Sequence, residues 1–168
     1  MPEWASTTVI IVLVVVIFVG MWAAWRGRSR RDAGLVPVRE LPTGLGTPAV
    51  SAHVLYVATT KPGEPLERLA ISGLGFRAQG TLAAYPSGVA IELDGSTDVW
   101  AEASVIIAAE PAQVAIDKVV EKGGLFKLTW QISDQPVDSY FRVLEPEKSA
   151  ALYDAIDAMT STSAESEA

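Results

Sequence analysis

The sequence contains no cysteine and a single histidine, His53. The lack of cysteine excludes disulfides, thiolate catalysis and Cys-based zinc or iron–sulfur sites. A Ser-His-Asp arrangement would require the histidine, but a lone histidine at the start of a predicted strand is ordinarily a surface or core residue. We therefore predict no catalytic residues and no cofactor, and a protein that is not an enzyme.

Basic residues are scarce outside one short segment. From Ala49 onward the chain carries 8 Lys and Arg against 17 Asp and Glu, a net charge of −9. Nucleic acids and anionic membrane surfaces attract proteins with a basic footprint, so this acidic part argues against nucleic-acid binding and against electrostatic adhesion to lipid. Lys61, Arg68 and Arg77 are too dilute, with two glutamates between them, to predict a phosphoinositide site.

Two further patterns fall short of a ligand site. Glu92, Asp94 and Asp98 surround a predicted hairpin turn, but they lack the remaining oxygen ligands and the glycine placement of a calcium loop. Gly73-Leu74-Gly75 lacks the later glycine and the Lys-Ser/Thr pair of a phosphate-binding loop. We interpret them as a solvated turn and a glycine-permitted turn or bulge, and we predict no metal site.

The feature that the sequence has in abundance is one apolar run, Ala5 to Ala24, which holds no charged side chain. In a helix this run is about 30 Å long, the thickness of the hydrocarbon core of a bilayer. The sequence therefore predicts a short external N-terminus over residues 1–4 and one transmembrane helix over residues 5–25.

Aromatic and basic residues frame this span. Indole rings favour the interface between headgroups and hydrocarbon, and tryptophans stand at both ends of the run. Four arginines follow it at once, whereas the N-terminal flank offers only Glu3 and the α-amino group. By the positive-inside rule, we predict a plasma-membrane protein with its N-terminus outside and its C-terminal domain cytoplasmic. The residues assigned to anchoring and orientation are Trp4, Trp22, Trp25, Arg26, Arg28, Arg30 and Arg31.

Two alternatives compete with this topology. A cleaved signal peptide would place basic residues before the apolar run and small residues where Trp22 and Trp25 stand, so it fits poorly. An outward-facing anchored domain is the other alternative, since the apolar run is N-terminal. Gly20 and Ala24 would let two such helices approach closely, but a single pair of this kind is common by chance.

Residues 26–50 begin basic and then collect glycine and proline without periodicity, which predicts a linker. A flexible segment of this length spans roughly 25–30 Å on average. The linker would let the following domain, residues 51–160, sit near the inner leaflet without being pressed on it. Residues 161–168 are small and polar and predict a disordered tail.

Most of the domain shows strand signals, with β-branched and aromatic runs separated by Gly, Pro and Asp. Leu152, Ile156 and Met159 then form the apolar stripe of an amphipathic helix from about Pro146 to Met159. A bent antiparallel sheet or small barrel of about seven strands, capped by this helix, buries the stripe, and this arrangement is pleckstrin-homology (PH)-like. The predicted strands are 51–60, 76–85, 89–93, 99–108, 126–132 and 139–144, with a weaker strand signal at 67–72 and a stretch at 112–122 whose pattern fits either a strand or a short helix.

The order of these features resembles a family of actinobacterial single-pass membrane proteins with a bacterial PH-like domain, described as probable export or membrane proteins and often encoded beside pyrimidine-biosynthesis enzymes. The resemblance implies the anchor and the fold, and none of its motifs carries known chemistry. The residues that carry it are Tyr56-Val57-Ala58-Thr59-Thr60, Gly73-Leu74-Gly75-Phe76-Arg77, Asp117-Lys118-Val119-Val120-Glu121, Gly124-Leu125, Trp130 and Asp138-Ser139-Tyr140-Phe141-Arg142.

With an anchor and no catalytic constellation, the sequence predicts a membrane-anchored interaction or scaffold module that binds a protein partner. An exposed strand edge would suit a peptide partner. An enzyme acting on a lipid or small molecule is the alternative from another class, and a pocket around Glu92, Asp98 or His53 would favour it.

Overall fold

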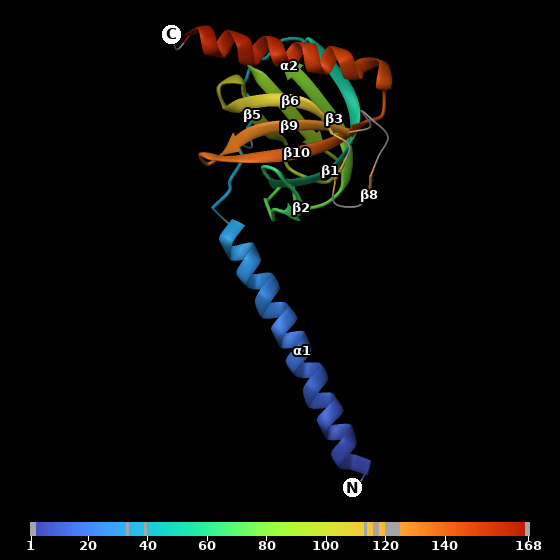
Figure 1. The fold of residues 1–168 in the computed structure, drawn as a ribbon. Helices are drawn as coiled ribbons and strands as arrows, with labels where there is room; N and C mark the ends of the chain where they lie inside the picture. Colours follow the sequence, from blue (N-terminus) through green and yellow to red (C-terminus); the bar gives the residue numbers. More distant parts are fainter. Residues whose placement is uncertain are drawn as a thin grey trace. The chain divides into compact units, whose positions relative to one another are not determined.

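The computed structural model describes residues 3–32, 34–38, 40–112, 114–115, 118–119 and 125–166. The chain forms two compact units, Met1–Gly34 and Leu35–Ala168. Figure 1 shows the N-terminal unit as one helix and the C-terminal unit as a bent sheet with a helix across one end. The predicted fold class is confirmed: an apolar N-terminal helix and a mainly-β, PH-like domain with a C-terminal helix.

Helix α1 (Glu3–Asp32) makes up the described N-terminal unit except for Gly34. An uninterrupted helix satisfies its backbone donors and acceptors internally, which an apolar run needs if it is to lie in lipid. The helix continues through the arginine-rich segment, so it ends seven residues after Trp25, where the sequence predicted that the linker had already begun.

The domain contains one antiparallel sheet of eight strands, in the order β5-β4-β3-β1-β10-β9-β6, with β2 paired to β1. β5 and β6 are the edges, so the sheet is open. The strands are β1 (Val50–Lys61), β2 (Glu64–Arg68), β3 (Ala78–Tyr85), β4 (Gly88–Leu93), β5 (Val99–Glu102), β6 (Ile106–Ala112), β9 (Leu125–Ile132) and β10 (Gln135–Val143).

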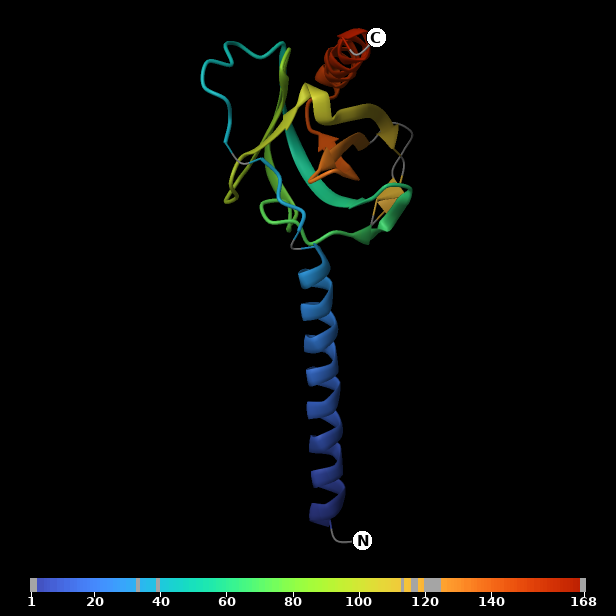
Figure 2. The same cartoon turned by 90° about the vertical axis from the view of Figure 1, so that its left-hand side faces the viewer.

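Strand β1 joins the two halves of the sheet. Residues 50–56 pair with β3, and residues 54–60 pair with β10 across a register shift between Tyr56 and Ala58. Such a bulge bends a strand and increases its twist. The sheet therefore folds around its apolar inner face, as Figure 2 shows, and the inner face holds the largest buried side chains, Trp130, Tyr56, Phe126 and Phe141.

Several predicted segments differ from the observed ones, and β10 begins at Gln135 instead of at the predicted residue 139. The run 99–108 is not one strand, because the 3-10 turn η1 (Ala103–Val105) separates β5, which pairs with β4, from β6, which pairs with β9. This break carries the chain from one edge of the sheet to the other. Strand β2 occupies residues 64–68 instead of 67–72. Of the ambiguous stretch, only the short pair β7 (Val114–Ala115) and β8 (Lys118–Val119) lies within the described residues.

Residues 35–49, which the sequence assigned to the linker, pack on the domain. Leu35 is buried in the main core, and the Trp100 amide donates to the Val38 carbonyl at 2.8 Å. Leu41 and Leu45 pack against a second apolar cluster on the outer face of β3, β4 and β5. This segment is rich in glycine and proline, which predicted a linker. Its leucines nevertheless pack on apolar surfaces of the folded sheet, which the local sequence pattern does not reveal.

Helix α2 (Pro146–Ser166) lies across one end of the sheet (Figure 1). The predicted stripe is buried: Leu152 and Ile156 are fully buried and Met159 nearly so. Tyr153 stacks on Phe126 with ring centroids 4.7 Å apart, which attaches the helix to β9. The helix continues to Ser166, beyond the predicted end at Met159 and into the segment that composition predicted to be disordered.

Candidate functional site

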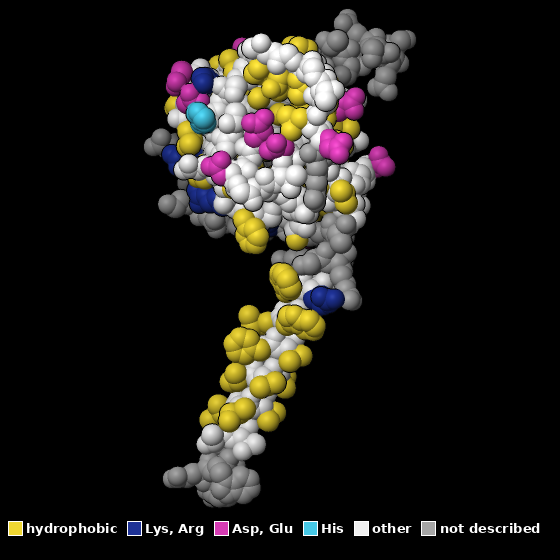
Figure 3. Space-filling view, turned by 180° about the vertical axis from the view of Figure 1, so that it is seen from behind, with side chains coloured by type: hydrophobic (Ala, Val, Ile, Leu, Met, Phe, Trp, Pro, Cys, Tyr) yellow, Lys and Arg dark blue, Asp and Glu magenta, His cyan; other side chains and the backbone are white. Residues whose placement is uncertain are grey.

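The first candidate is α1 itself. Residues Thr7–Gly27 form one stretch that is long and apolar enough to cross a membrane, a test that an N-terminal signal sequence would also pass. Hydrophobic side chains are exposed all along this stretch, as Figure 3 shows in yellow. A helix whose apolar side chains are exposed on every side is stable only against lipid or another apolar surface.

The residues that the sequence predicts to anchor and orient the chain lie toward the two ends of α1. Trp22 and Trp25 are exposed, and the Arg26 guanidinium lies over the Trp22 ring, 5.6 Å from its centroid. This contact, one helical turn apart, is a cation–π geometry. Trp4 stands in the first turn of α1, whereas Arg28, Arg30 and Arg31 stand in its last turns. Their anchoring and orienting roles stay predictions.

The second candidate is a chain of buried hydroxyls inside the domain. The Trp130 Nε1 group donates to Ser139 Oγ at 2.9 Å, and Ser139 Oγ lies 2.8 Å from Thr59 Oγ1. Thr59 Oγ1 lies 2.9 Å from the Tyr56 hydroxyl, which donates to the Leu74 carbonyl at 2.7 Å. Because a carbonyl only accepts, the single Tyr56 proton goes to Leu74, and the protons of Thr59 and Ser139 point along the same chain.

These hydrogen bonds give each buried hydroxyl a partner. They also link β1, β9 and β10 to the segment that follows β2. Burial raises the pKa of Tyr56 to about 12, an effect that the Thr59 hydrogen bond and the charge of Arg68 only partly oppose. The Tyr56 hydroxyl therefore stays protonated at neutral pH. Its role is structural, since a group that holds its proton this firmly is a poor acid or base near neutral pH.

Arg68 lies beside this chain. Its Nε and Nη2 atoms are buried and have no hydrogen-bond partner among the described residues. Its charge acts on the Tyr56 hydroxyl, as the pKa of that group shows. Arg77, in contrast, is exposed, and Lys61 pairs with Glu67. The three basic residues therefore occupy three different environments, and the structure describes no common cluster of them.

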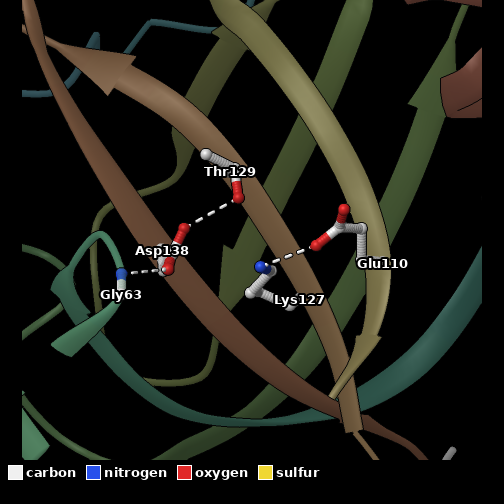
Figure 4. Close-up of polar contacts among 5 residues, drawn as sticks. All are labelled: Gly63, Glu110, Lys127, Thr129 and Asp138. Carbon is white, nitrogen blue, oxygen red and sulfur yellow. Dashed lines mark hydrogen bonds and ion pairs between the residues drawn. The ribbon is translucent and has the colours of Figure 1, made fainter. Parts of the chain in front are cut away.

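A third group of polar residues lies on β9 and β10, opposite the core (Figure 4). The buried Asp138 carboxylate accepts from Thr129 Oγ1 at 2.7 Å and from the Gly63 amide at 3.3 Å. A buried carboxylate is costly unless such donors compensate it. The contact with Gly63 fixes the turn between β1 and β2 onto β10, so Asp138 acts as a structural clamp.

Lys127 and Glu110 form the adjacent ion pair, with 2.7 Å between Nζ and Oε2. Burial alone would lower the pKa of Lys127, but the hydrogen bond to Glu110 and the charge of Asp138 outweigh it and raise the pKa. Burial and the charge of Asp138 also raise the pKa of Tyr140. Lys127 and Tyr140 both keep their protons at neutral pH, so neither is an activated base or nucleophile.

The residues that sequence patterns raised as possible ligands lie apart from these networks. The His53 side chain is exposed, and its backbone amide donates to Glu145 Oε2 at 2.8 Å. Hydrogen bonds from Lys148 and from this amide lower the pKa of Glu145. Glu92, Asp94 and Asp98 are exposed, and the described residues contain no group of three or more potential metal ligands.

Gly73-Leu74-Gly75 forms a turn, as its glycines predicted. Gly73 has a φ of 85°, a conformation that favours glycine, and its carbonyl accepts from Ser96 Oγ at 2.7 Å. Leu74 is buried and its carbonyl closes the hydroxyl chain. Several segments that carried the family resemblance thus have structural roles, since Tyr56, Thr59 and Ser139 form the chain and Asp138 forms the clamp. The alternation of apolar and polar residues along the strands did not reveal these roles, because it predicts which face a side chain lies on and not which residue it contacts.

The bent open sheet, with a C-terminal helix across one end, defines the class of the domain as PH-like. The sequence model of the bacterial PH domain-like family matches residues 35–157. The chain therefore belongs to this family, and the match begins at Leu35, the residue at which the structure begins the domain.

Comparison with curated proteins gives no match. Among solved structures, the chain is similar to one in a structure described as the 8S snRNP assembly intermediate, with a TM-score of 0.48 and 6% sequence identity. The similarity covers 75% of this chain and 89% of that chain.

Proposed function

We propose that this protein is an interaction module, a PH-like domain that α1 holds at the cytoplasmic face of the plasma membrane, where it binds a protein partner. The observation that carries the proposal is the joint pattern at α1, an apolar span of 21 residues followed at once by a cluster of arginines. The span supplies localisation, and the arginines supply orientation by the positive-inside rule.

The character of the domain supports an interaction role. Its acidic composition gives no basic footprint for nucleic acid or for electrostatic lipid binding. The polar networks described above are satisfied structural contacts, and they contain no nucleophile beside an activated base. Strands β5 and β6 stand at the edges of the sheet, and an edge is the surface to which an extended peptide adds.

Single cysteines test the topology, because the native chain has none. Ala168→Cys and Glu3→Cys variants of the full chain are treated in intact cells with a membrane-impermeant maleimide, and again after lysis. We expect Glu3→Cys to be labelled in intact cells and Ala168→Cys only after lysis. Labelling of Ala168→Cys in intact cells would establish an outward-facing domain, and a mature protein that begins after α1 would establish a signal peptide.

A matched variant tests what sets the orientation. In it, Arg26, Arg28, Arg30 and Arg31 are all changed to Gln, in the Ala168→Cys background. We expect labelling at position 168 in intact cells to rise, because the charge asymmetry across the span is lost. Unchanged protection would mean that these arginines do not decide the topology.

Photo-crosslinking in native membranes tests the partner. A photoreactive residue replaces Ile107 on β6 or Glu102 on β5, both of which are exposed, and Asp157 on α2 provides the comparison position. We expect a discrete crosslinked protein from one of the two edges. Absence of any reproducible adduct, together with turnover of a lipid or small molecule by the purified protein, would favour the alternative function as an enzyme.

A further inference from the structure

Two large apolar side chains of the domain are unusually exposed. Phe76 has 88% of its surface exposed, and Leu66 on β2 has 72%. Single exposed hydrophobic residues are common on soluble proteins, but an aromatic ring is among the most costly side chains to leave in water. An apolar surface that covers both side chains would remove this cost.

Their position within the domain is informative. Phe76 belongs to the segment between β2 and β3, and Ser96 ties this segment to the turn before β5 through the Gly73 carbonyl. Both segments, and strand β2 with Leu66, lie at the end of the sheet away from α2 (Figures 1 and 2). Hydrophobic side chains are visible at this end of the domain in Figure 3.

The N-terminal segment of the domain starts at the same end. The Val36 amide donates to Ser133 Oγ in the β9–β10 turn at 3.2 Å, and the Val38 carbonyl accepts from Trp100 at the start of β5. Val36 and Val38 are themselves 58% exposed. The chain therefore enters the domain at the end that carries Phe76 and Leu66.

The stretch of sequence between the span and the domain is short. The span ends at Gly27, α1 continues to Asp32, and Leu35 is already buried in the domain core. Residues 28–34 lie between the span and Leu35, and residues 28–32 belong to α1, so little of the chain is left for a flexible linker.

We propose that Phe76 and Leu66 insert into the interface of the bilayer that holds α1. This inference rests on the proposed anchoring function. The contact is apolar in character, because two hydrophobic side chains carry it and the basic residues of these segments, Lys61, Arg68 and Arg77, form no common cluster. It therefore requires no anionic lipid, and it gives the domain a fixed face toward its partner instead of free rotation on a tether.

Labelled single-cysteine variants of the full chain test this contact. Phe76→Cys and Leu66→Cys carry an environment-sensitive fluorophore, and Leu144→Cys, an exposed apolar position between β10 and α2, carries the same fluorophore as the control. The proteins are reconstituted into phosphatidylcholine nanodiscs with or without nitroxide-labelled lipid. We expect at least about threefold stronger lipid quenching at positions 76 and 66 than at position 144, because only an inserted side chain meets the nitroxide.

A fourth label separates this inference from the anchor on which it rests. Val16→Cys lies in the middle of the span, and strong quenching there shows that α1 is in the bilayer. Strong quenching at position 16, with equal and weak quenching at 76, 66 and 144, would overturn the insertion and leave the anchor standing. Weak quenching at position 16 would overturn the anchor itself.

Discussion

The backbone amide of Val36 donates to Ser133 Oγ at 3.2 Å, joining two residues that are 97 positions apart in the chain. Ser133 and Asp134 form a two-residue turn in which both have positive φ, 48° and 63°, as hairpin turns of this length require. This turn is thus a fixed surface onto which the chain docks directly after α1. The domain begins there, well before the first strand.

We first predict that Leu35→Ala destabilises the domain by about 2–3 kcal/mol, because it removes a buried leucine from the main core. Val36→Ala is the matched control, since Val36 is exposed, and we expect it to change stability by less than about 0.5 kcal/mol. Urea unfolding of the full chain in detergent measures both. Equal midpoints for the two variants would mean that residues 35–38 are a linker.

Ser139→Ala should lower the unfolding free energy by about 1–3 kcal/mol, because it leaves the buried Trp130 Nε1 donor without an acceptor and Thr59 without its neighbour. Ser87→Ala, in the exposed turn between β3 and β4, provides the comparison and should be nearly neutral. Near-ultraviolet circular dichroism would report the change around Trp130. A stability equal to that of Ser87→Ala would show that the hydroxyl chain contributes nothing.

The buried hydroxyls of Tyr56 and Tyr153 should respond oppositely to the same substitution. Tyr56→Phe removes the donor to Leu74 and should cost about 1–3 kcal/mol. The buried Tyr153 hydroxyl has no well-aligned hydrogen-bond partner among the described residues, although the nearby Ser149 side chain partly opposes the rise in its pKa, and the Tyr153 ring stacks on Phe126. Tyr153→Phe keeps the stack and removes the unpaired group, so stability should be unchanged or rise by up to about 1 kcal/mol. Thermal unfolding of both variants in one detergent compares them directly, and a loss for Tyr153→Phe would contradict this account.

Stability should fall as the pH rises from about 10 to 12. Below pH 10 Tyr56 is protonated in both states, whereas above it the unfolded state loses this proton and the folded state, with a pKa of about 12, retains it. The unfolded state is therefore favoured progressively, by up to about 2.5 kcal/mol. Burial also raises the pKa of Tyr140 and of Tyr153, so they act in the same direction.

Tyr56→Phe isolates the Tyr56 contribution to this pH dependence, because the other tyrosines remain. Its unfolding free energy should decline less steeply than that of the native chain over this range. Parallel declines, measured by urea unfolding at several pH values, would show that Tyr56 does not carry the effect.

Local pattern was sufficient where one property repeats over many residues. The uncharged run before Trp25 specified α1, because an uninterrupted apolar run of that length predicts a helix long enough to cross a membrane. Alternation of Phe126, Leu128 and Trp130 specified β9, and the stripe of α2 specified which of its faces is buried. These elements, with the turns between them, were enough to predict a PH-like fold.

Tertiary structure decided what depends on surfaces that are distant in sequence. Leu35, Leu41 and Leu45 stand among glycines and prolines, and only the folded sheet offers the apolar surface that they cover. The break at η1 exists because the chain passes there from one edge strand of the sheet to the other, and the local sequence does not show where those edges lie. The buried polar contacts likewise depend on the fold, which brings each donor to its acceptor. Asp138 and Gly63, for example, are 75 residues apart in the chain. The sequence by itself thus determined the apolar helix and the class of the domain, because these follow from local pattern. The start of the domain and its buried polar contacts follow instead from long-range packing.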